Sequence, residues 1–170
     1  MLDISEEVPF EIPNSWQWCR ISSIMRVVMG QSPEGETIND SKGVEFHQGK
    51  ICFTETIISP SGIYTQKPAK IAEPNSLLLC VRAPVGICNI TDRAICIGRG
   101  LCALKPYYNA DLMLWLFFMS TYKKYFDERA TGSTFKAISQ DTISQTLIPL
   151  PPHSEQIRIV KQVRAIFDYL

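Results

Sequence analysis

Short apolar segments separated by turn residues fill the middle of the chain. They read VEFHQ, KICFT, IYTQ, LLLCV, ICNI, AICI and LCALK, and glycine, proline or short polar groups interrupt them. Short runs rich in β-branched and aromatic side chains, bounded by such residues, are typical of β-strands. The pattern predicts a twisted, mostly antiparallel or mixed sheet.

Helical periodicity follows the predicted strands. Apolar residues recur at helical spacing at Leu112, Trp115, Leu116, Met119, Tyr122 and Phe126. With Asn109 as its cap, this pattern predicts a helix over residues 110–128 that covers the sheet, which makes the fold class α+β. We expect a short helix or strand over residues 21–29, a loop from Gly30 to Gly43, and an extended segment over residues 147–152.

A second helix is predicted from Ser154 to the end of the chain. Ile159, Val163, Ile166 and Leu170 recur at steps of four, three and four, which is the spacing of a heptad seam and also of an ordinary amphipathic surface helix. Since no helix-breaking residue precedes Leu170, we expect a fragment cut within a longer helix. The predicted division is a globular domain over residues 1–152 and the start of a spacer helix over residues 153–170.

Charge distribution refines this picture more than composition does. With 170 residues and 45% hydrophobic content, the chain is sized for one domain with a proper core. Seventeen basic residues balance seventeen acidic ones, so net charge favours no class of partner. Between Phe46 and Lys105, however, there are seven basic residues and three acidic ones. This region presents either a positive face or scattered solvated charge.

Several kinds of chemistry have little support in the sequence. The glycine-containing strings lack the GK[ST] ending of a phosphate-binding loop, and no GxSxG motif is present. The six cysteines show no CxxC spacing and lie mostly in apolar runs, which indicates core residues in a reduced compartment. We therefore expect no catalytic residue, metal or cofactor. The longest apolar run, LMLWLFFM, is too short to cross a bilayer, so we expect a soluble, cytoplasmic protein without membrane association.

Basic side chains near predicted strand ends are the candidate functional groups. Arginine's planar guanidinium matches phosphate oxygens and the major-groove edge of guanine, and glutamine matches adenine. The stretch VRAPVGICNITDRAICIGRG places Arg82, Arg93 and Arg99 at such ends without an obvious catalytic partner. For any single arginine, a structural salt bridge with Glu73 or Asp92 remains the simpler explanation. Together, these residue types fit a DNA reader.

Seven strings strengthen that interpretation: IPNSWQWCRISSI, GQSPEGETIN, FHQGK, KPAKIAEPNSLLLCVRAPVGICNIT, ICIGRGLCALKP, GSTFKAIS and IPLPPHSEQIRIV. In this order they resemble the target-recognition domain of the DNA-specificity subunit of type I restriction-modification systems, from Ile12 to about Phe167. The resemblance implies a DNA-reading domain followed by a long helix. In that family two such domains, separated by a helical spacer, each read half of a split target. This sequence holds one, and it carries Asn75-Ser76 where members often carry Gly-Asp.

The resemblance also implies a division of labour between subunits. The specificity subunit is non-catalytic, while a modification (methyltransferase) subunit transfers methyl groups from S-adenosylmethionine to adenine and a restriction subunit cleaves DNA with ATP and Mg. The implied partners are double-stranded DNA and these two subunits, and the implied cofactors lie on the partner subunits only. The seam also predicts packing against a partner helix, which comes from the missing half, from another copy in a homodimer through the C-terminal helix, or from the modification subunit. A different hypothesis makes this chain an assembly module with negligible DNA affinity of its own.

The resemblance and the residue chemistry together name a set of site residues. The candidates for DNA contact are Gln31, Ser32, Gln48, Lys50, Arg82, Arg93, Arg99, Ser133, Thr134 and Lys136. Those for packing against a partner helix are Ile159, Val163, Ile166 and Leu170. Because strings shared by a family cannot distinguish targets that differ among its members, we expect base-reading residues in the loops 34–45 and 54–66. Arg82 and Arg99 are then expected to contact the DNA backbone or support the fold.

Overall fold

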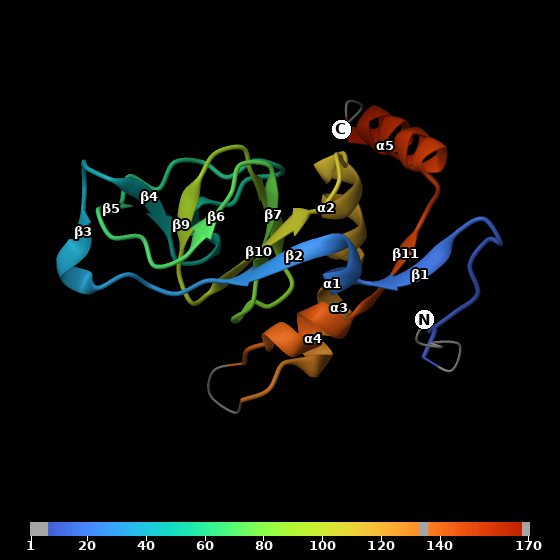
Figure 1. Ribbon diagram of the computed structural model, residues 1–170, viewed down its shortest axis with the longest axis horizontal. Helices are drawn as coiled ribbons and strands as arrows, with labels where there is room; N and C mark the ends of the chain where they lie inside the picture. The colour runs from blue at the N-terminus through green and yellow to red at the C-terminus, as the bar shows by residue number, and fades with distance from the viewer. Residues whose placement is uncertain (1–6, 133–135, 168–170) are drawn as a thin grey trace.

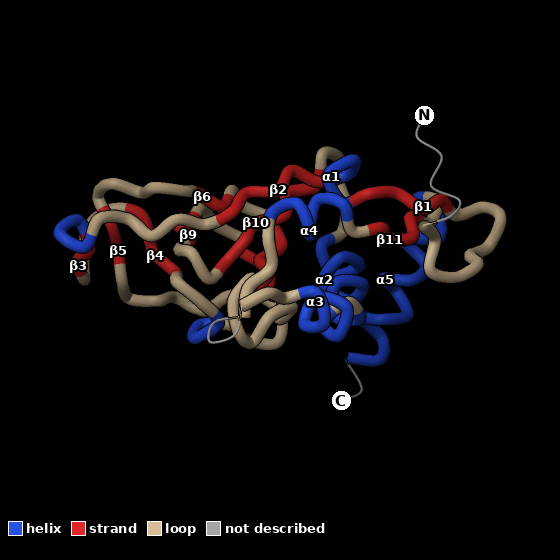
Figure 2. Tube along the Cα trace, turned by 90° about the horizontal axis from the view of Figure 1, so that it is seen from below, coloured by secondary structure: helices blue, strands red, loops and turns tan. Residues whose placement is uncertain are grey.

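The computed structural model describes residues 7–132 and 136–167, which form an elongated α+β molecule (Figure 1). Short strands occupy one end, and the helices α2 (Leu112–Thr121), α3 (Lys123–Arg129) and α5 (His153–Phe167) lie toward the other, as the view from below also shows (Figure 2). A four-stranded sheet, a five-stranded sheet and a two-stranded ribbon make up the β structure of these residues. The predicted fold class is confirmed.

The four-stranded sheet is antiparallel throughout and lies in the middle of the molecule. Its order is β2 (Met25–Met29), β10 (Leu101–Pro106), β7 (Ser76–Cys80) and β8 (Cys88–Thr91). Every residue of β7 is buried, and its side chains alternate between two hydrophobic clusters, with Leu77 and Leu79 in one and Leu78 and Cys80 in the other. A strand covered on both faces explains why LLLC is a continuous apolar run rather than an alternating one.

The five-stranded sheet is built from shorter strands. Its order is β3 (Ile38–Asn39), β5 (Tyr64–Thr65), β4 (Val44–His47), β9 (Ile95–Ile97) and β6 (Ile71–Ala72). The pair β4–β9 is parallel, so the sheet is mixed. Within the segment expected to be a loop, η1 (Gly35–Thr37) precedes β3.

The predicted strand KICFT is wrong. Lys50–Cys52 forms a 3-10 turn, η2, closed by a hydrogen bond from the Phe53 N–H to the Lys50 carbonyl at 2.9 Å. The Cys52 carbonyl accepts hydrogen bonds from the N–H and the hydroxyl of Ser59, both at 2.9 Å. These contacts satisfy the carbonyl groups of Lys50 and Cys52, so the segment does not need a neighbouring strand as a hydrogen-bond partner.

The predicted helix over residues 110–128 is divided in two. Asp111, not Asn109, caps α2 (Leu112–Thr121), because its carboxylate accepts from the Met113 N–H at 2.9 Å. The helix breaks at Tyr122 before α3 (Lys123–Arg129). The hydroxyls of the last two residues of α2 bond back to carbonyls three residues earlier, which competes with the helical backbone pattern. The large side chains of both helices, Trp115 and Phe126 among them, still fill the core.

The remaining elements connect the two ends of the chain. β1 (Gln17–Arg20) pairs with β11 (Leu147–Leu150), as the extended segment over residues 147–152 leads one to expect. α1 (Ile21–Ile24) continues directly into β2, so the segment 21–29 is helix and then strand. α4 (Gln140–Gln145) begins at Ser139, whose hydroxyl caps it. Within the described residues no helix is long and apolar enough to span a membrane.

The C-terminal helix α5 (His153–Phe167) folds back on the domain and contacts α2. Val160 and Val163 are buried and Ile159 packs against the main core, whereas Ile166 is 61% exposed. The structure therefore corrects the predicted seam, because the domain itself covers Ile159 and Val163. Leu170 lies outside the described residues. The division of the chain after residue 152 stays a prediction.

Asp111 joins α2 to α5, because its second carboxylate oxygen accepts from Arg164 at 2.9 Å. Asp111→Ala removes both the cap and this ion pair, so we expect the free energy of unfolding to fall by about 1 to 2 kcal/mol. Asp111→Asn keeps a capping oxygen and should lose only a few tenths of a kcal/mol, roughly the value of an exposed ion pair. Urea unfolding at pH 7 of both variants checks this, and equal losses would contradict the capping role.

Candidate nucleic-acid interface

Four of the predicted DNA-contacting residues line one small pocket between the two large sheets. Gln48 and Lys50 follow β4, Arg82 follows β7, and Arg99 lies in the turn between β9 and β10. The pocket has a volume of about 170 Å³, and its lining also includes Cys80, Ala83 and Pro84. Residues up to 51 positions apart in the sequence thus share one site.

Close backbone packing without side chains brings these segments together. A Cβ atom on Gly100 would lie 2.3 Å from the Gln48 carbonyl oxygen, and one on Gly30 would lie 2.1 Å from the Gly98 carbonyl oxygen. Hydrogen bonds tie the same segments together, from the Gly98 N–H to the His47 carbonyl at 2.8 Å and from the Val81 N–H to the Gly100 carbonyl at 2.9 Å. Only glycine allows main chains to approach this closely. We refer to Gly30, Gly98 and Gly100 as the glycine junction.

The cations of the pocket have no internal counter-charge among the described residues. Lys50, Arg82 and Arg99 are exposed and form no salt bridge there, and Glu73, one proposed partner, is paired with Arg26 instead. Burial raises the pKa of the Cys80 thiol to about 11, against the lowering effect of the Lys50 charge, so this thiol is neutral at pH 7. Three positive side chains around one hollow favour binding of an anion.

Other candidate residues lie beside this pocket. Gln31 is exposed, and its N–H donates to the Ile97 carbonyl at 2.9 Å, next to the glycine junction; Ser32 follows it and is half-buried. The Lys136 carbonyl accepts from the Ala83 N–H at 3.2 Å, which places Lys136 next to the Arg82 segment. The Lys136 ammonium is 4.0 Å from the Asp127 carboxylate. Ser133 and Thr134 lie outside the described residues.

Arg93 lies elsewhere, and the structure assigns it a structural role in place of the predicted DNA contact. Its guanidinium donates to both oxygens of Glu45 at 2.7 and 3.1 Å, to the Ile58 carbonyl at 3.1 Å, and to Asp92 at 3.0 Å. Asp92 was one of the salt-bridge partners that the sequence offered. Because these contacts engage its donors, we remove Arg93 from the candidate interface.

Glu45 is the centre of this ionic cluster. It also accepts from the Ser61 N–H at 2.7 Å and lies 2.8 Å from the His47 ring nitrogen. Burial alone would raise the pKa of the Glu45 carboxyl, but hydrogen bonds from Arg93, Ser61 and His47 lower it to about 2. Burial lowers the pKa of His47, although Glu45 opposes this shift. The cluster thus holds the loop 54–66 against β4, and that loop is one of the two predicted to read bases.

Sequence reasoning missed one exposed residue beside the pocket. Ile51, in the turn η2, is 94% exposed. Its place inside the apparent strand KICFT concealed this, because a strand residue of this type is expected to be half-buried. The available signal was Gly49 directly before the segment, since glycine weakens a strand interior and often marks an irregularity.

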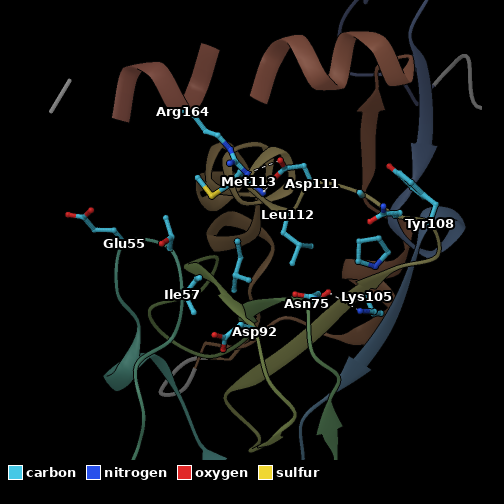
Figure 3. Close-up of a pocket in the computed structure, with 15 residues that line it drawn as sticks. Glu55, Ile57, Asn75, Asp92, Lys105, Tyr108, Asp111, Leu112, Met113 and Arg164 are labelled. Atoms are coloured by element: carbon cyan, nitrogen blue, oxygen red, sulfur yellow. Dashed lines mark hydrogen bonds and ion pairs between the residues drawn. The ribbon is translucent and has the colours of Figure 1, made fainter. Parts of the chain in front are cut away.

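A second, wider pocket of the described residues does not fit a polyanion. It has a volume of about 940 Å³ and lies between the loop before β5, the end of β10 and the start of α2 (Figure 3). Its lining mixes the acids Glu55, Asp92 and Asp111 with Lys105 and Arg164. Arg164 is paired with Asp111, and the three acids outnumber the two bases, so the lining carries no excess of positive charge for a polyanion.

Comparison with known proteins connects this geometry to a family. The sequence model of the type I restriction modification DNA specificity domain matches residues 13–169. The chain belongs to this family. The resemblance inferred from the seven strings is therefore confirmed. Within the described residues of this specificity domain, no group of three or more histidine, cysteine, aspartate or glutamate side chains is arranged to hold a metal ion.

Individual relatives agree with the family assignment. The chain is 36% identical over 164 residues to the MjaX type I restriction enzyme specificity subunit named in Methanocaldococcus jannaschii, covering 94% of this chain and 38% of that protein. The crystal structure of the HsdS subunit from Thermoanaerobacter tengcongensis matches with a TM-score of 0.84 and 34% identity, over 95% of this chain and 39% of that one.

A chain from a structure that describes complex assembly and conformational transition of the type I restriction-modification system has a TM-score of 0.85 and 35% identity. It is matched over 95% of this chain and 40% of its own length. The chain thus spans about two fifths of the length of these relatives.

The glycine junction predicts a sharp contrast between two substitutions. In Gly100→Ala the new methyl group would overlap the Gln48 carbonyl, so we expect a loss of about 1 to 3 kcal/mol or more in the free energy of unfolding. Gly35→Ala is the matched control, because no atom lies within 4 Å of its Cβ position. Urea unfolding compares the two, and a Gly100→Ala protein as stable as the control would show that the junction tolerates a side chain.

The ionic cluster predicts a pH-dependent effect of Glu45→Gln. Because folding lowers the pKa of Glu45 to about 2, its stabilising contribution is full above its ordinary pKa and is lost as the pH falls toward 2. At pH 7 we expect the variant to lose on the order of 3 kcal/mol, and the difference from wild type should narrow between about pH 5 and 2. Urea unfolding at several pH values measures this. Glu34→Gln, at an exposed position, is the control, and a constant difference at all pH values would contradict the mechanism.

Proposed function

We propose that this specificity domain reads one half-site of a double-stranded DNA target. The observation that carries this proposal is the convergence of Lys50, Arg82 and Arg99 with Gln48 in one pocket, without acidic partners among the described residues. Polyanion binding requires positive side chains that are not neutralised internally, and sequence reading requires donors and acceptors beside them. The names of the relatives, all specificity subunits, support it.

The contacts divide by chemistry. Lys50, Arg82, Arg99 and Lys136 would bind phosphates and set the register of the domain on the duplex. Gln31, Ser32 and Gln48, together with the loops 34–45 and 54–66, would contact base edges in the major groove. Ser133 and Thr134 remain predicted contacts from the loop that also contains Lys136.

The chemistry of restriction and modification belongs to other subunits in this proposal. A modification subunit would methylate adenine with S-adenosylmethionine, and a restriction subunit would supply ATP- and Mg-dependent cleavage. The specificity domain would direct both to their site and bind no cofactor itself. Residues 153–170 would begin the spacer helix that connects it to these partners or to a second recognition domain.

A second candidate function is assembly. On α5, Ile157 and Ile166 are 59% and 61% exposed, and such apolar side chains favour a helical partner. In this alternative the helix forms a homodimer or binds the modification subunit, and the domain alone has negligible DNA affinity. Replacing both isoleucines by serine should then abolish dimerisation of the chain, or its co-sedimentation with the modification subunit, in sedimentation velocity.

Selection from a pool of randomised duplexes, followed by sequencing, tests the main proposal. We expect a short enriched motif that the chain binds more tightly than random duplex, with an affinity that decreases as salt increases. Equal binding to all duplexes would mean that specificity requires additional domains. Absence of binding at low salt would favour the assembly function instead.

Arg99→Gln tests the phosphate role directly. Loss of one phosphate contact should weaken binding to all duplexes and reduce the slope of log K against log salt by about 0.9. The enriched motif should not change. Arg158→Gln on α5 is the control, since Arg158 is exposed and belongs to the opposite end of the molecule. A changed motif in Arg99→Gln would assign base reading, rather than phosphate binding, to Arg99.

A further inference from the structure

We propose that Ile51 contacts the 5-methyl group of a thymine in the major groove and so determines specificity at one base pair. This inference rests on the proposed DNA-reading function. Ile51 is 94% exposed, the highest value among the large hydrophobic residues exposed in the described structure. It directly follows Lys50, one of the cations that line the pocket, and therefore lies where the proposed function places DNA.

The exposure of Ile51 is imposed by a fixed turn. The turn η2 is closed by a hydrogen bond from the Phe53 N–H to the Lys50 carbonyl. The Cys52 carbonyl accepts two hydrogen bonds from Ser59. Cys52 and Phe53 pack against the second hydrophobic cluster, while Gly49 packs beside Gly100. Since the neighbours are anchored, the Ile51 side chain cannot fold inward without breaking the turn. An isoleucine held in water forgoes the stabilisation that burial would give, which favours a role outside the fold.

The chemistry of the side chain selects its counterpart on DNA. An isoleucine side chain donates and accepts no hydrogen bond, so it cannot recognise the polar atoms of base edges. The thymine methyl is the apolar group that base edges present in the major groove. A β-branched side chain also has few χ1 rotamers, so little conformational entropy is lost when it contacts the methyl group. The flanking cations would hold the phosphates on either side of the groove.

Other exposed isoleucines lack this setting. Ile38, Ile57 and Ile63 are at most 45% exposed and do not line the pocket of Lys50, Arg82 and Arg99, and Ile157 and Ile166 belong to α5. Among these residues, exposure and adjacency to a cation of the pocket coincide only at Ile51. This combination distinguishes Ile51 from isolated surface hydrophobes, which are common and need no explanation.

The test replaces thymine by deoxyuridine, which lacks only the methyl group, at each thymine of the duplex that the wild-type chain selects. We expect one position at which deoxyuridine weakens wild-type binding about three- to five-fold, the effect of one methyl group. Ile51→Ser should bind the thymine duplex more weakly and lose the distinction between thymine and deoxyuridine at that position. Ile51→Val should retain it. Tyr107→Ser, a change at a 63% exposed residue beyond the end of β10, should behave as wild type.

Each other result overturns the inference in a recognisable way. Equal effects of deoxyuridine on wild type and Ile51→Ser would show that another residue contacts the methyl group. Weaker binding by Ile51→Ser without any effect of deoxyuridine, with wild type raising the fluorescence of 2-aminopurine in the duplex, would indicate a wedge between base pairs. If wild type selects no motif, the proposed function itself fails. Unchanged urea midpoints for the Ile51 variants confirm that folding is unaffected.

Discussion

The close approach of three backbone segments at the glycine junction is the constraint on which the candidate interface depends. Gly30 follows β2 and lies against the Gly98 carbonyl, Gly98 and Gly100 flank Arg99, and the carbonyl of Gln48 lies against Gly100. A side chain at Gly30 or Gly100 would separate these segments, because the opposing atoms are rigid main chain rather than flexible side chains. The junction connects the two large sheets. It also fixes the backbone positions from which Lys50, Arg82 and Arg99 extend into their pocket. The same close backbone contacts therefore determine both how the two sheets are joined and how the pocket is shaped.

Arg93 differs from Arg82 and Arg99 because it forms ion pairs within the domain. Arg93 and Glu45 form a half-buried, multiply hydrogen-bonded pair that includes Ser61 and His47. Charge-assisted hydrogen bonds of this kind are strong, and their removal leaves buried groups unsatisfied. Arg82 and Arg99 are instead surrounded by main chain and glycine, with a neutral thiol nearby. Their charge is directed to solvent, where a phosphate can replace water.

Sequence reasoning succeeded where one force dominates. The strand LLLC is predictable because burial on both faces requires a continuous apolar run, and the neighbouring turn residues place Arg82 and Arg99 at strand ends. Their convergence in one pocket was not predicted. Sequence reasoning failed where local alternatives compete. Asn109 and Asp111 are both good caps, and only the structure shows that Asp111 is chosen, with Arg164 as an additional partner. The pairing of Arg93 with Glu45, 48 positions away, depends on the parallel contact of β4 with β9 and has no local signal.

The packing of α5 limits how this domain can be connected to further chain. Val160 and Val163 are covered by the domain, and Gln156 donates from its side chain to the Pro151 carbonyl at 2.9 Å. The start of the helix is thus fixed in direction by the domain that precedes it. Ile157 and Ile166 are exposed, and because they are nine positions apart they lie on opposite flanks of this buried face. A helix that is anchored to its domain transmits orientation, because a partner bound to its exposed surface is held at a defined angle to the pocket lined by Lys50, Arg82 and Arg99. If the helix connects this domain to a second recognition domain, as proposed, such an angle would determine which spacing between half-sites the assembled complex accepts.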